Sequence, residues 1–259
     1  MDLKNKTVAI IQARMGSTRL PGKVLMEIQG LPMIIQMVNR LKSVAEVDDV
    51  IIATTNLISD DPISQVAKSN RIPCFRGSEK DVLKRFFLAS KNCKAQHIIR
   101  ITGDCPLVDP QIISQLIEFY KNSSYDFCGV ASGAGVANQK RIKRFPDGLD
   151  AEIFSFRVLK EAHLNASGNL YREHVTPFIW KDNKKYKVGS LYSKIDLSRL
   201  RLTVDNEEDF LFINWIYDNL YPSNKAFNLR DILQLLEEKK YKPVNAHLIG
   251  MEGYEKFWK

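Results

Sequence analysis

Short apolar runs alternate with amphipathic segments through the first half of the chain, and this alternation restricts the folds open to it. Four runs have the length and composition of buried strands, at residues 8–13, 50–55, 72–75 and 97–102. Apolar residues at helical spacing lie between them. Since strands that alternate with helices build β-α-β units, the pattern predicts an α/β fold with a mainly parallel, twisted sheet and helices on both faces.

The expected helices carry signals at their starts and along their inward faces. Asp109 followed by Pro110 is typical of an N-cap and a first helical residue. Ser78 is expected to cap an earlier helix, because Asp81 follows it at the spacing of a capping box. Apolar residues at helical spacing mark the inward face of the first helix: Met33, Ile34, Met37, Val38 and Leu41.

The second half of the chain is less regular. It predicts a strand near residues 149–155, a helix interrupted at Pro177, and a strand over residues 199–204 that leads into a helix with an acidic first turn. We therefore expect a single domain over residues 1–259, with a small inserted lobe at about residues 131–193.

Charge points to an anionic partner. The 38 Lys and Arg residues against 30 Asp and Glu give a net charge of +8 and a pI near 9.2. A basic protein of this kind suits nucleic acid, a membrane surface or a small polyanion. For the basic patch at residues 139–145, a binding role and a plain surface loop are both open, whereas a solvated face explains the patch at residues 181–187.

Residue spacing excludes several kinds of site. The four cysteines form no C-x-x-C pair and the four histidines form no zinc-binding pattern, so neither a disulfide framework nor a structural zinc is expected. The first apolar run is too short for a secretory signal, and no stretch approaches the length of a membrane span. These features indicate a cytoplasmic protein without a membrane partner.

The loop after the first expected strand has the chemistry of an anion site. It reads QARMGSTRLPGKVL and places Gly16 among the cations Arg14, Arg19 and Lys23. Glycine lets the backbone approach a ligand, and backbone N–H groups and cations bind phosphate oxygens. Neither the Walker A motif nor G-x-G-x-x-G is present. The loop therefore predicts anion binding of another kind, with a merely solvated loop as the alternative.

Five segments, in order along nearly the whole chain, resemble one enzyme family. They are QARMGSTRLPGKVL, ITGDCPLVDP, FPDGLDAEIFSF, YREHVTP and RLTVDNEEDF. Together they resemble the nucleotide-sugar cytidylyltransferases, which include the acylneuraminate and 3-deoxy-manno-octulosonate (KDO) enzymes, and are nearest to the spore-coat SpsF-type branch. The resemblance implies a Rossmann-like nucleotidyltransferase fold, CTP as the donor, Mg²⁺ as the cofactor and a homodimer.

The resemblance also implies roles for individual residues. Lys23, Arg14 and Asp104 become the expected catalytic residues, and Asp104 and Asp205 the expected Mg²⁺ ligands. Gln12 stands where the sialic-acid and KDO enzymes have proline, which leaves the acceptor sugar open more than the reaction class. The segments that hold the nucleotide in the family correspond here to Gln12, Ala13, Arg14, Gly16, Ser17, Arg19, Lys23, Thr102 and Asp104.

Physical chemistry supports a pairing of cations with carboxylates. Nucleotidyl transfer depends on positioning and on compensating charge on the departing pyrophosphate. Mg²⁺ favours a few carboxylate oxygens plus phosphate and water. Asp104 and Asp205 each follow an expected strand, so they could converge on one ion. Both also have structural explanations, because Asp205 precedes a helix that it would cap and Asp104 lies in a turn sequence.

Acceptor binding is expected from two later segments of the chain. The structural alternative for the first segment is turn formation at Pro-Asp-Gly, and for the second it is a place on a helix surface. An acceptor that attacks through a phosphate or carboxylate oxygen needs no base, whereas a hydroxyl acceptor needs one or a metal-bound equivalent. The inserted lobe would serve acceptor binding or dimerisation. The expected acceptor-binding residues are Arg144, Asp147, Asp150, Glu173 and His174, with Arg141 and Lys143 able to close over an anionic acceptor.

The sequence therefore predicts a Mg²⁺-dependent cytidylyltransferase that joins CMP from CTP to an acidic or phosphorylated sugar, releases pyrophosphate and serves surface polysaccharide or glycoconjugate synthesis. One alternative is a sugar nucleotidyltransferase that uses UTP, GTP or ATP. Another is a nucleic-acid-binding protein that uses the basic loop at residues 139–145, although the loop lacks the aromatic and basic pattern of an RRM. A third is a non-catalytic nucleotide sensor, against which Lys23, Asp104 and Asp205 argue.

Overall fold

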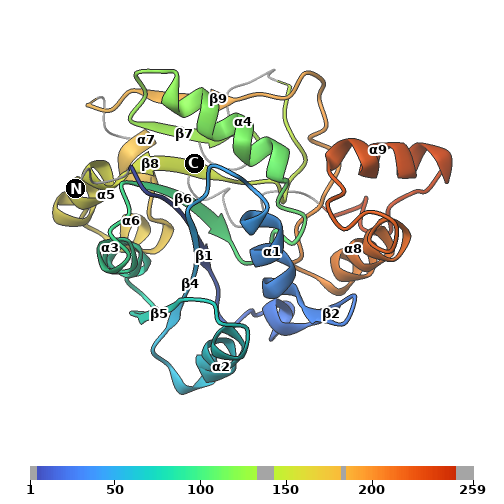
Figure 1. Ribbon diagram of the computed structural model, residues 1–259, viewed down its shortest axis with the longest axis horizontal. Helices are drawn as coiled ribbons and strands as arrows, with labels where there is room; N and C mark the ends of the chain where they lie inside the picture. Colours follow the sequence, from blue (N-terminus) through green and yellow to red (C-terminus); the bar gives the residue numbers. More distant parts are fainter. Residues whose placement is uncertain (1–4, 133–142, 182–184, 249–259) are drawn as a thin grey trace.

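A seven-stranded sheet forms the centre of the molecule, with helices on both of its faces (Figure 1). The computed structural model describes residues 5–132, 143–181 and 185–248. The strands of this sheet are β1 (Thr7–Gln12), β4 (Asp49–Thr55), β5 (Cys74–Gly77), β6 (His97–Thr102), β7 (Phe127–Val130), β8 (Glu152–Ser155) and β9 (Val188–Leu191). A separate two-stranded ribbon joins β2 (Glu27–Ile28) to β3 (Leu31–Pro32).

The strand order is β5-β4-β1-β6-β8-β7-β9. β1 pairs in parallel with β4 and β6, β4 pairs in parallel with β5, and β7 pairs in parallel with β9. β8 runs antiparallel to both of its neighbours, β6 and β7. The predicted α/β architecture with a mainly parallel sheet is confirmed.

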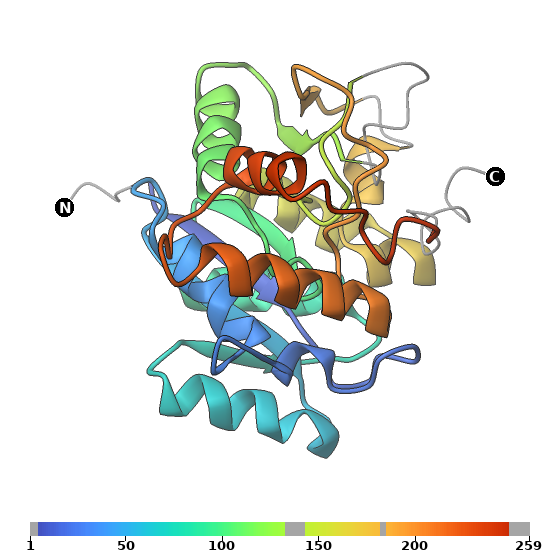
Figure 2. The same cartoon turned by 90° about the vertical axis from the view of Figure 1, so that its right-hand side faces the viewer.

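Helices cover the sheet in two layers, which Figures 1 and 2 show from two directions. Buried side chains of α1, α4 and α8 join one apolar cluster with the sheet, and those of α3, α5 and α7 join the other. The helices are α1 (Met33–Lys42), α2 (Asp61–Ser69), α3 (Val82–Asn92), α4 (Pro110–Lys121), α5 (Phe156–Asn165), α6 (Asn169–His174), α7 (Pro177–Trp180), α8 (Glu207–Leu220) and α9 (Leu229–Glu238), with short 3₁₀ turns η1 (Lys23–Leu25) and η2 (Ile58–Asp60).

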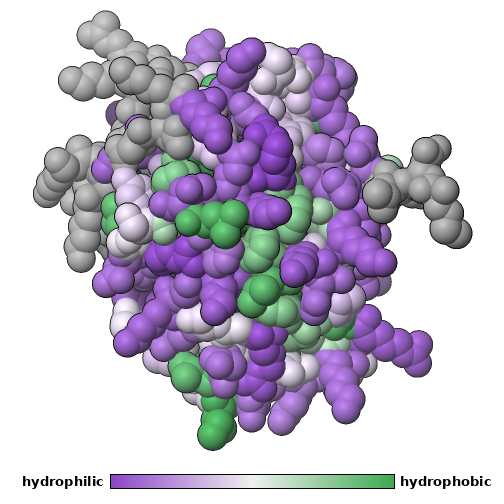
Figure 3. Space-filling view, turned by 90° about the vertical axis from the view of Figure 1, so that its left-hand side faces the viewer, coloured by the Kyte–Doolittle hydropathy of each residue, from purple (hydrophilic) through white to green (hydrophobic). Residues whose placement is uncertain are grey.

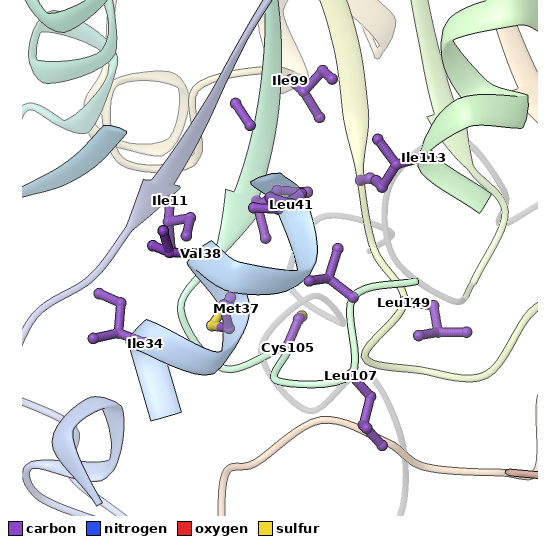
Figure 4. Close-up of a cluster of buried hydrophobic side chains, with 14 of the residues drawn as sticks. Ile11, Ile34, Met37, Val38, Leu41, Ile99, Cys105, Leu107, Ile113 and Leu149 are labelled. Carbon is purple, nitrogen blue, oxygen red and sulfur yellow. The ribbon is translucent and has the colours of Figure 1, made fainter. Parts of the chain in front are cut away.

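β1 shows why both faces of the sheet must be covered. Its side chains alternate, so Ala9 and Ile11 belong to the cluster under α1, whereas Val8 and Ile10 belong to the cluster under α3, and all four are fully buried. The expected inward face of α1 is confirmed, because its apolar residues are fully or almost fully buried. Figure 4 shows four of them in the same cluster as Ile11 of β1 and Ile99 of β6: Ile34, Met37, Val38 and Leu41.

The helix starts agree with one sequence prediction and correct another. Asp109 caps α4, since its side chain accepts from the backbone N–H of Gln111, and Pro110 is the first helical residue. The prediction that Ser78 caps α3 is wrong. Asp81 is the cap and accepts from Lys84 N at 2.9 Å, while the Ser78 hydroxyl accepts from Asp81 N one turn earlier. The serine therefore closes a turn that leads into the helix.

The predicted strand at residues 199–204 is also wrong. Within the described residues the segment makes one isolated bridge, Arg201 with Asp147, instead of joining the sheet. Gly148 allows this approach: its φ is +96°, and a Cβ there would lie 2.3 Å from the carbonyl carbon of Leu202. The segment thus runs beside loops at the end of the sheet rather than beside a strand.

Of the described residues in the range 131–193, those of β8 and β9 are strands of the seven-stranded sheet. The expected helix interruption falls just before Pro177. Val175 between α6 and α7 has φ 71° and ψ −58°, and Thr176 N donates to His174 O at 2.8 Å. This geometry is that of a classic γ-turn, which is strained for a β-branched residue. The proposed role of the lobe in acceptor binding or dimerisation stays a prediction.

The surface drawn in Figure 3 is mostly hydrophilic, with apolar side chains in separate small patches. Within the described ranges, no helix combines the length and the apolar character that crossing a bilayer would require.

Candidate active site

A cavity of about 370 Å³ opens where β1 and β6 end, at the carboxyl edge of the parallel strands. Ligands of open α/β sheets bind at this edge. The volume lies within the range of about 300–1,000 Å³ typical of small-molecule sites. Most of the sequence-predicted site residues line it: Gln12, Ala13, Arg14, Gly16, Ser17, Arg19, Lys23, Thr102, Asp104, Asp147, Asp150, His174 and Asp205.

The loop after β1 is folded by its own backbone. The carbonyl of Met15 accepts from Ser17 N at 2.9 Å and from Gly22 N at 3.0 Å. The N–H of Met15 donates to the buried carboxylate of Asp60 at 2.7 Å. Gly22 has φ 73°, a left-handed conformation that glycine adopts without strain, and it turns the chain into η1. The closed loop places Lys23 at the start of η1, against the floor of the cavity.

Lys23 is buried and surrounded by oxygen atoms. Its Nζ donates to Val204 O at 2.6 Å and to Asp205 Oδ1 at 2.8 Å, and lies 3.5 Å from Asp104 Oδ2. Only 8% of the residue is exposed. Burial by itself would lower the pKa of Lys23, but Asp104 and Asp205 outweigh it and raise the pKa above its ordinary value. The side chain is therefore a fixed cation.

Backbone contacts bring Asp104 and Asp205 together. The carbonyl of Asp104 accepts from Val204 N at 2.8 Å and from the Thr203 hydroxyl at 3.1 Å. The Asp205 carboxylate pairs with Arg19 at 3.0 Å in addition to Lys23. Burial would raise the pKa of Asp205, but its cationic neighbours outweigh that effect and lower it. The two segments, 99 or more residues apart, thus meet as the sequence predicted.

Asp205 does not cap α8, so that structural explanation of the residue is wrong. Asn206 is the cap, and a capping box with Asp209 closes the first turn. The Asp209 carboxylate accepts from the backbone N–H groups of both Asp205 and Asn206. The Asp205 side chain is consequently available to the cavity.

Arg201 is a site residue that sequence reasoning missed. Its guanidinium pairs with Asp147, Asp205 and Asp209, each at 2.9 Å, and the residue is only 6% exposed. The fully buried Asp209 in turn accepts from Asn245 Nδ2 at 2.8 Å. An arginine between two leucines, in a segment expected to be a strand, was the available signal.

Asp147 and Asp150 form the acidic side of the cavity. Burial, the charge of Asp150 and other carboxylates raise the pKa of Asp147 to about 7, against the opposing effect of Arg201. Burial also raises the pKa of Asp150, which accepts from the Ser132 hydroxyl and from Gly148 N. Asp147 therefore lies in the Pro-Asp-Gly turn and also lines the cavity, so turn formation does not rule out a role in binding.

A second missed group is an ion pair that also lines the cavity. Arg100, in the middle of β6, pairs with Glu152 of β8 at 2.7 Å and donates to Gln12 Oε1 at 3.2 Å. The Thr176 hydroxyl donates to the Glu152 carboxylate at 2.9 Å. Arg100 was visible in the sequence as a charged residue within an apolar strand. Arg100 is buried and Glu152 is half-buried, and both side chains line the cavity.

The other predicted acceptor residues are placed differently. His174 lines the cavity, and burial lowers its pKa, which favours the neutral imidazole. Glu173 is exposed, and the backbone N–H of Arg144 donates to Asp196. Glu173 and Arg144 are not among the described residues that line the cavity. Lys143 is exposed, whereas Arg141 and residues 139–142 of the basic loop lie outside the described ranges.

The oxygen atoms around Lys23 bear on the predicted metal ion. In the part of the chain that the structure describes, no group of three or more His, Cys, Asp or Glu side chains is arranged to hold a metal. Mg²⁺, however, commonly takes one or two protein carboxylates and completes its shell with substrate phosphates and water. Asp104 and Asp205 supply hard oxygen donors around a position already occupied by a cation, so the residues present fit such an ion.

The chain is similar to known proteins over most of its length. The model of a family described as cytidylyltransferase matches residues 8–244. The chain is 38% identical over 248 residues to an uncharacterised protein of Methanocaldococcus jannaschii, covering 94% of this chain and 96% of that protein. It is 32% identical over 220 residues to the spore coat polysaccharide biosynthesis protein SpsF of Bacillus subtilis, covering 82% and 87%.

Two further comparisons concern a shorter match and a solved structure. The chain is 30% identical over 133 residues to 3-deoxy-manno-octulosonate cytidylyltransferase of Rhodopseudomonas palustris, covering 50% of this chain and 53% of that enzyme. The structure of a cytidylyltransferase from Leptospira borgpetersenii superposes with a TM-score of 0.81 at 30% identity, covering 91% of this chain and 95% of that one. The likeness of fold thus extends over most of the chain.

Proposed function

The chain belongs to the cytidylyltransferase family, and from that premise we propose that it transfers CMP from CTP to an acidic or phosphorylated sugar, releasing pyrophosphate, for surface polysaccharide or glycoconjugate synthesis. The observation that carries the proposal is the meeting of Lys23 with Asp104 and Asp205 at the floor of the cavity. It brings together three of the five segments that carry the family resemblance.

The loop after β1 supports a role in binding the triphosphate. Arg14, Arg19 and Lys23 all line the cavity, and Gly16 leaves open space where a side chain would stand. Cations and backbone N–H groups neutralise the charge that develops on a departing pyrophosphate. We assign the triphosphate to this side, with Gln12, Ala13, Ser17 and Thr102 beside it.

Asp104 and Asp205 would hold Mg²⁺ when nucleotide is bound. An ion there would lower the charge of the triphosphate and orient its phosphates. The residues themselves bind the ion, while Arg201 holds the Asp205 carboxylate in place at 2.9 Å. The homodimer implied by the family resemblance stays a prediction beside this proposal.

Another set of groups in the same cavity suits the acceptor. Asp147, Asp150 and His174 line it together with the Arg100–Glu152 pair. If the acceptor attacks through a hydroxyl, Asp147 is placed to take its proton, since its pKa of about 7 allows a carboxylate base near neutral pH. An acceptor that attacks through a phosphate or carboxylate oxygen would use the same groups for orientation alone.

Calorimetric titration tests the donor. CTP, UTP, GTP and ATP are each titrated with Mg²⁺ into the wild-type protein and the Asp104→Asn variant. We expect selective binding of CTP, weakened in the variant because a metal ligand is lost. Asp61→Asn is the matched control, because Asp61 pairs with Arg76 at the surface and does not line the cavity.

Other outcomes separate the alternatives. Preferred binding of another triphosphate would keep the enzyme class and change the base. Binding of RNA or DNA without any triphosphate would contradict the proposal and favour the basic loop. After selective CTP binding, release of pyrophosphate in the presence of candidate sugars would identify the acceptor and exclude a non-catalytic sensor.

A further inference from the structure

Lys23 occupies a position that suits a metal ion. Its Nζ lies within 2.6–3.5 Å of three oxygen atoms that come from two segments of the chain, Val204 O, Asp205 Oδ1 and Asp104 Oδ2. The ammonium thus stands between the two carboxylates that the proposed function assigns to Mg²⁺. An ammonium and a divalent cation cannot share this position, because both require the same oxygens and repel each other.

We propose that the Lys23 ammonium fills the cation position between Asp104 and Asp205 in the nucleotide-free protein, and keeps a divalent cation out until a triphosphate draws the ammonium toward its phosphates. The inference rests on the proposed function, which supplies the metal and the nucleotide. It makes Lys23 both a phosphate ligand and the residue that links metal binding to nucleotide binding.

The surroundings of Lys23 explain why an internal cation is needed. Asp104 and Asp205 lie beside two further carboxylates, Asp147 and Asp150, in a partly buried cavity. Carboxylates this close together stay ionised together only with compensating cations, and otherwise one of them binds a proton. Lys23 supplies that compensation before the ligands arrive. Once a triphosphate attracts the ammonium, the two carboxylates would lose it and require the divalent ion that accompanies the nucleotide.

Binding of Mn²⁺ to the nucleotide-free protein tests the proposal. Free Mn²⁺ is measured by electron paramagnetic resonance during titration of wild type, Lys23→Met and Lys23→Gln. Removing the ammonium should tighten Mn²⁺ binding by about tenfold or more, within the usual range of coupling between two sites. Mn²⁺ should also raise the melting temperature of these variants more than that of wild type. Adding Asp104→Asn to Lys23→Met should abolish the gain.

Two controls separate occupancy from overall charge. Arg19→Met removes another cation paired with Asp205, and Lys6→Met removes a lysine that pairs with Asp49 and does not line the cavity. We expect a smaller gain from Arg19→Met and none from Lys6→Met. An equal gain from Arg19→Met would overturn the proposal, because loss of any nearby positive charge would then suffice.

The remaining outcomes also decide the question. Unchanged or weaker Mn²⁺ binding in both Lys23 variants would overturn the proposal. If neither variant folds, wild type decides it, since micromolar Mn²⁺ binding without nucleotide contradicts an occupied position and much weaker binding supports it. If the variants bind Mn²⁺ more tightly but wild type does not bind CTP, the proposed function is overturned and the inference about Lys23 stands. If wild type binds CTP but the variants bind Mn²⁺ no more tightly than wild type, the inference about Lys23 is overturned and the proposed function stands.

Discussion

At the scale of single residues, the cavity holds more carboxylate than its buried cations balance. Asp104, Asp147, Asp150 and Asp205 all line it, and Arg201 pairs with two of them. Asp147 is affected most clearly, because burial and the neighbouring carboxylates raise its pKa to about 7. A group with a raised acid pKa binds its proton more tightly in the folded state than in the unfolded state, so it stabilises the fold only while protonated.

The pH dependence of stability follows from this residue. The contribution of Asp147 is complete below its unfolded pKa of 3.8 and is lost as the pH rises through about 7. Wild type should therefore lose more free energy of unfolding between pH 5 and about 8 than Asp147→Asn, which has no carboxylate to ionise. Urea unfolding at several pH values measures both, with Asp61→Asn as a surface control. Parallel pH profiles of wild type and Asp147→Asn would contradict the prediction.

At the scale of elements, the site depends on a close crossing of two loops rather than on paired strands. Asp147 N donates to Leu200 O at 3.2 Å, and Leu202 N donates to Asp147 O at 2.7 Å. This crossing carries Arg201 and the following residues to the cavity. Gly148 makes it possible, because no side chain fits between the two backbones.

Substitution of Gly148 tests the crossing. Gly148→Ala should destabilise the protein by about 2–4 kcal/mol, since it combines strain at positive φ with a direct backbone clash. Gly168→Ala is the matched control, because Gly168 has a similar φ of +90° but nothing within 4 Å of its would-be Cβ. The control carries only the strain of its backbone conformation, about 1–3 kcal/mol, and should cost less than Gly148→Ala. Equal losses in urea unfolding would show that the crossing imposes no close contact.

The sequence correctly predicted those elements that form from signals between residues close together in the chain. The alternating strands and helices of the first half, the inward face of α1 and the Asp109 cap needed only periodicity and capping chemistry. The strand expected at residues 199–204 failed because its partner is a loop brought in by the tertiary fold. Arg201 was missed for the same reason, since its partners Asp147 and Asp209 become neighbours only after folding.

At the scale of the whole molecule, the cavity joins parts of the chain that are far apart in sequence. Lys23 contacts residues 181 and 182 positions later, and Asn245 reaches back 44 positions to Arg201. Contacts with such separation usually form late in folding, because loop closure must come first. A ligand that binds the completed cavity should therefore act mainly on unfolding.

Bound nucleotide should slow unfolding rather than speed folding. At about 100 times its dissociation constant, CTP with Mg²⁺ would stabilise the protein by about 2.7 kcal/mol. If the cavity is unformed in the transition state, the unfolding rate falls by about a hundredfold while the folding rate is unchanged. Stopped-flow measurements with and without CTP check this, with Mg²⁺ alone as the control. A rise in the folding rate would show that the site forms early.

The long separation between Lys23 and its partners also has a consequence for protein synthesis. At roughly 5–20 residues per second, a ribosome adds Val204 and Asp205 about 10–35 s after Lys23. During that interval the loop after β1 has been translated, but two of the three oxygens that hold its ammonium, those of Val204 and Asp205, do not yet exist. A nucleotide site that uses all three oxygens can therefore form on the nascent chain only after residue 205 has been added.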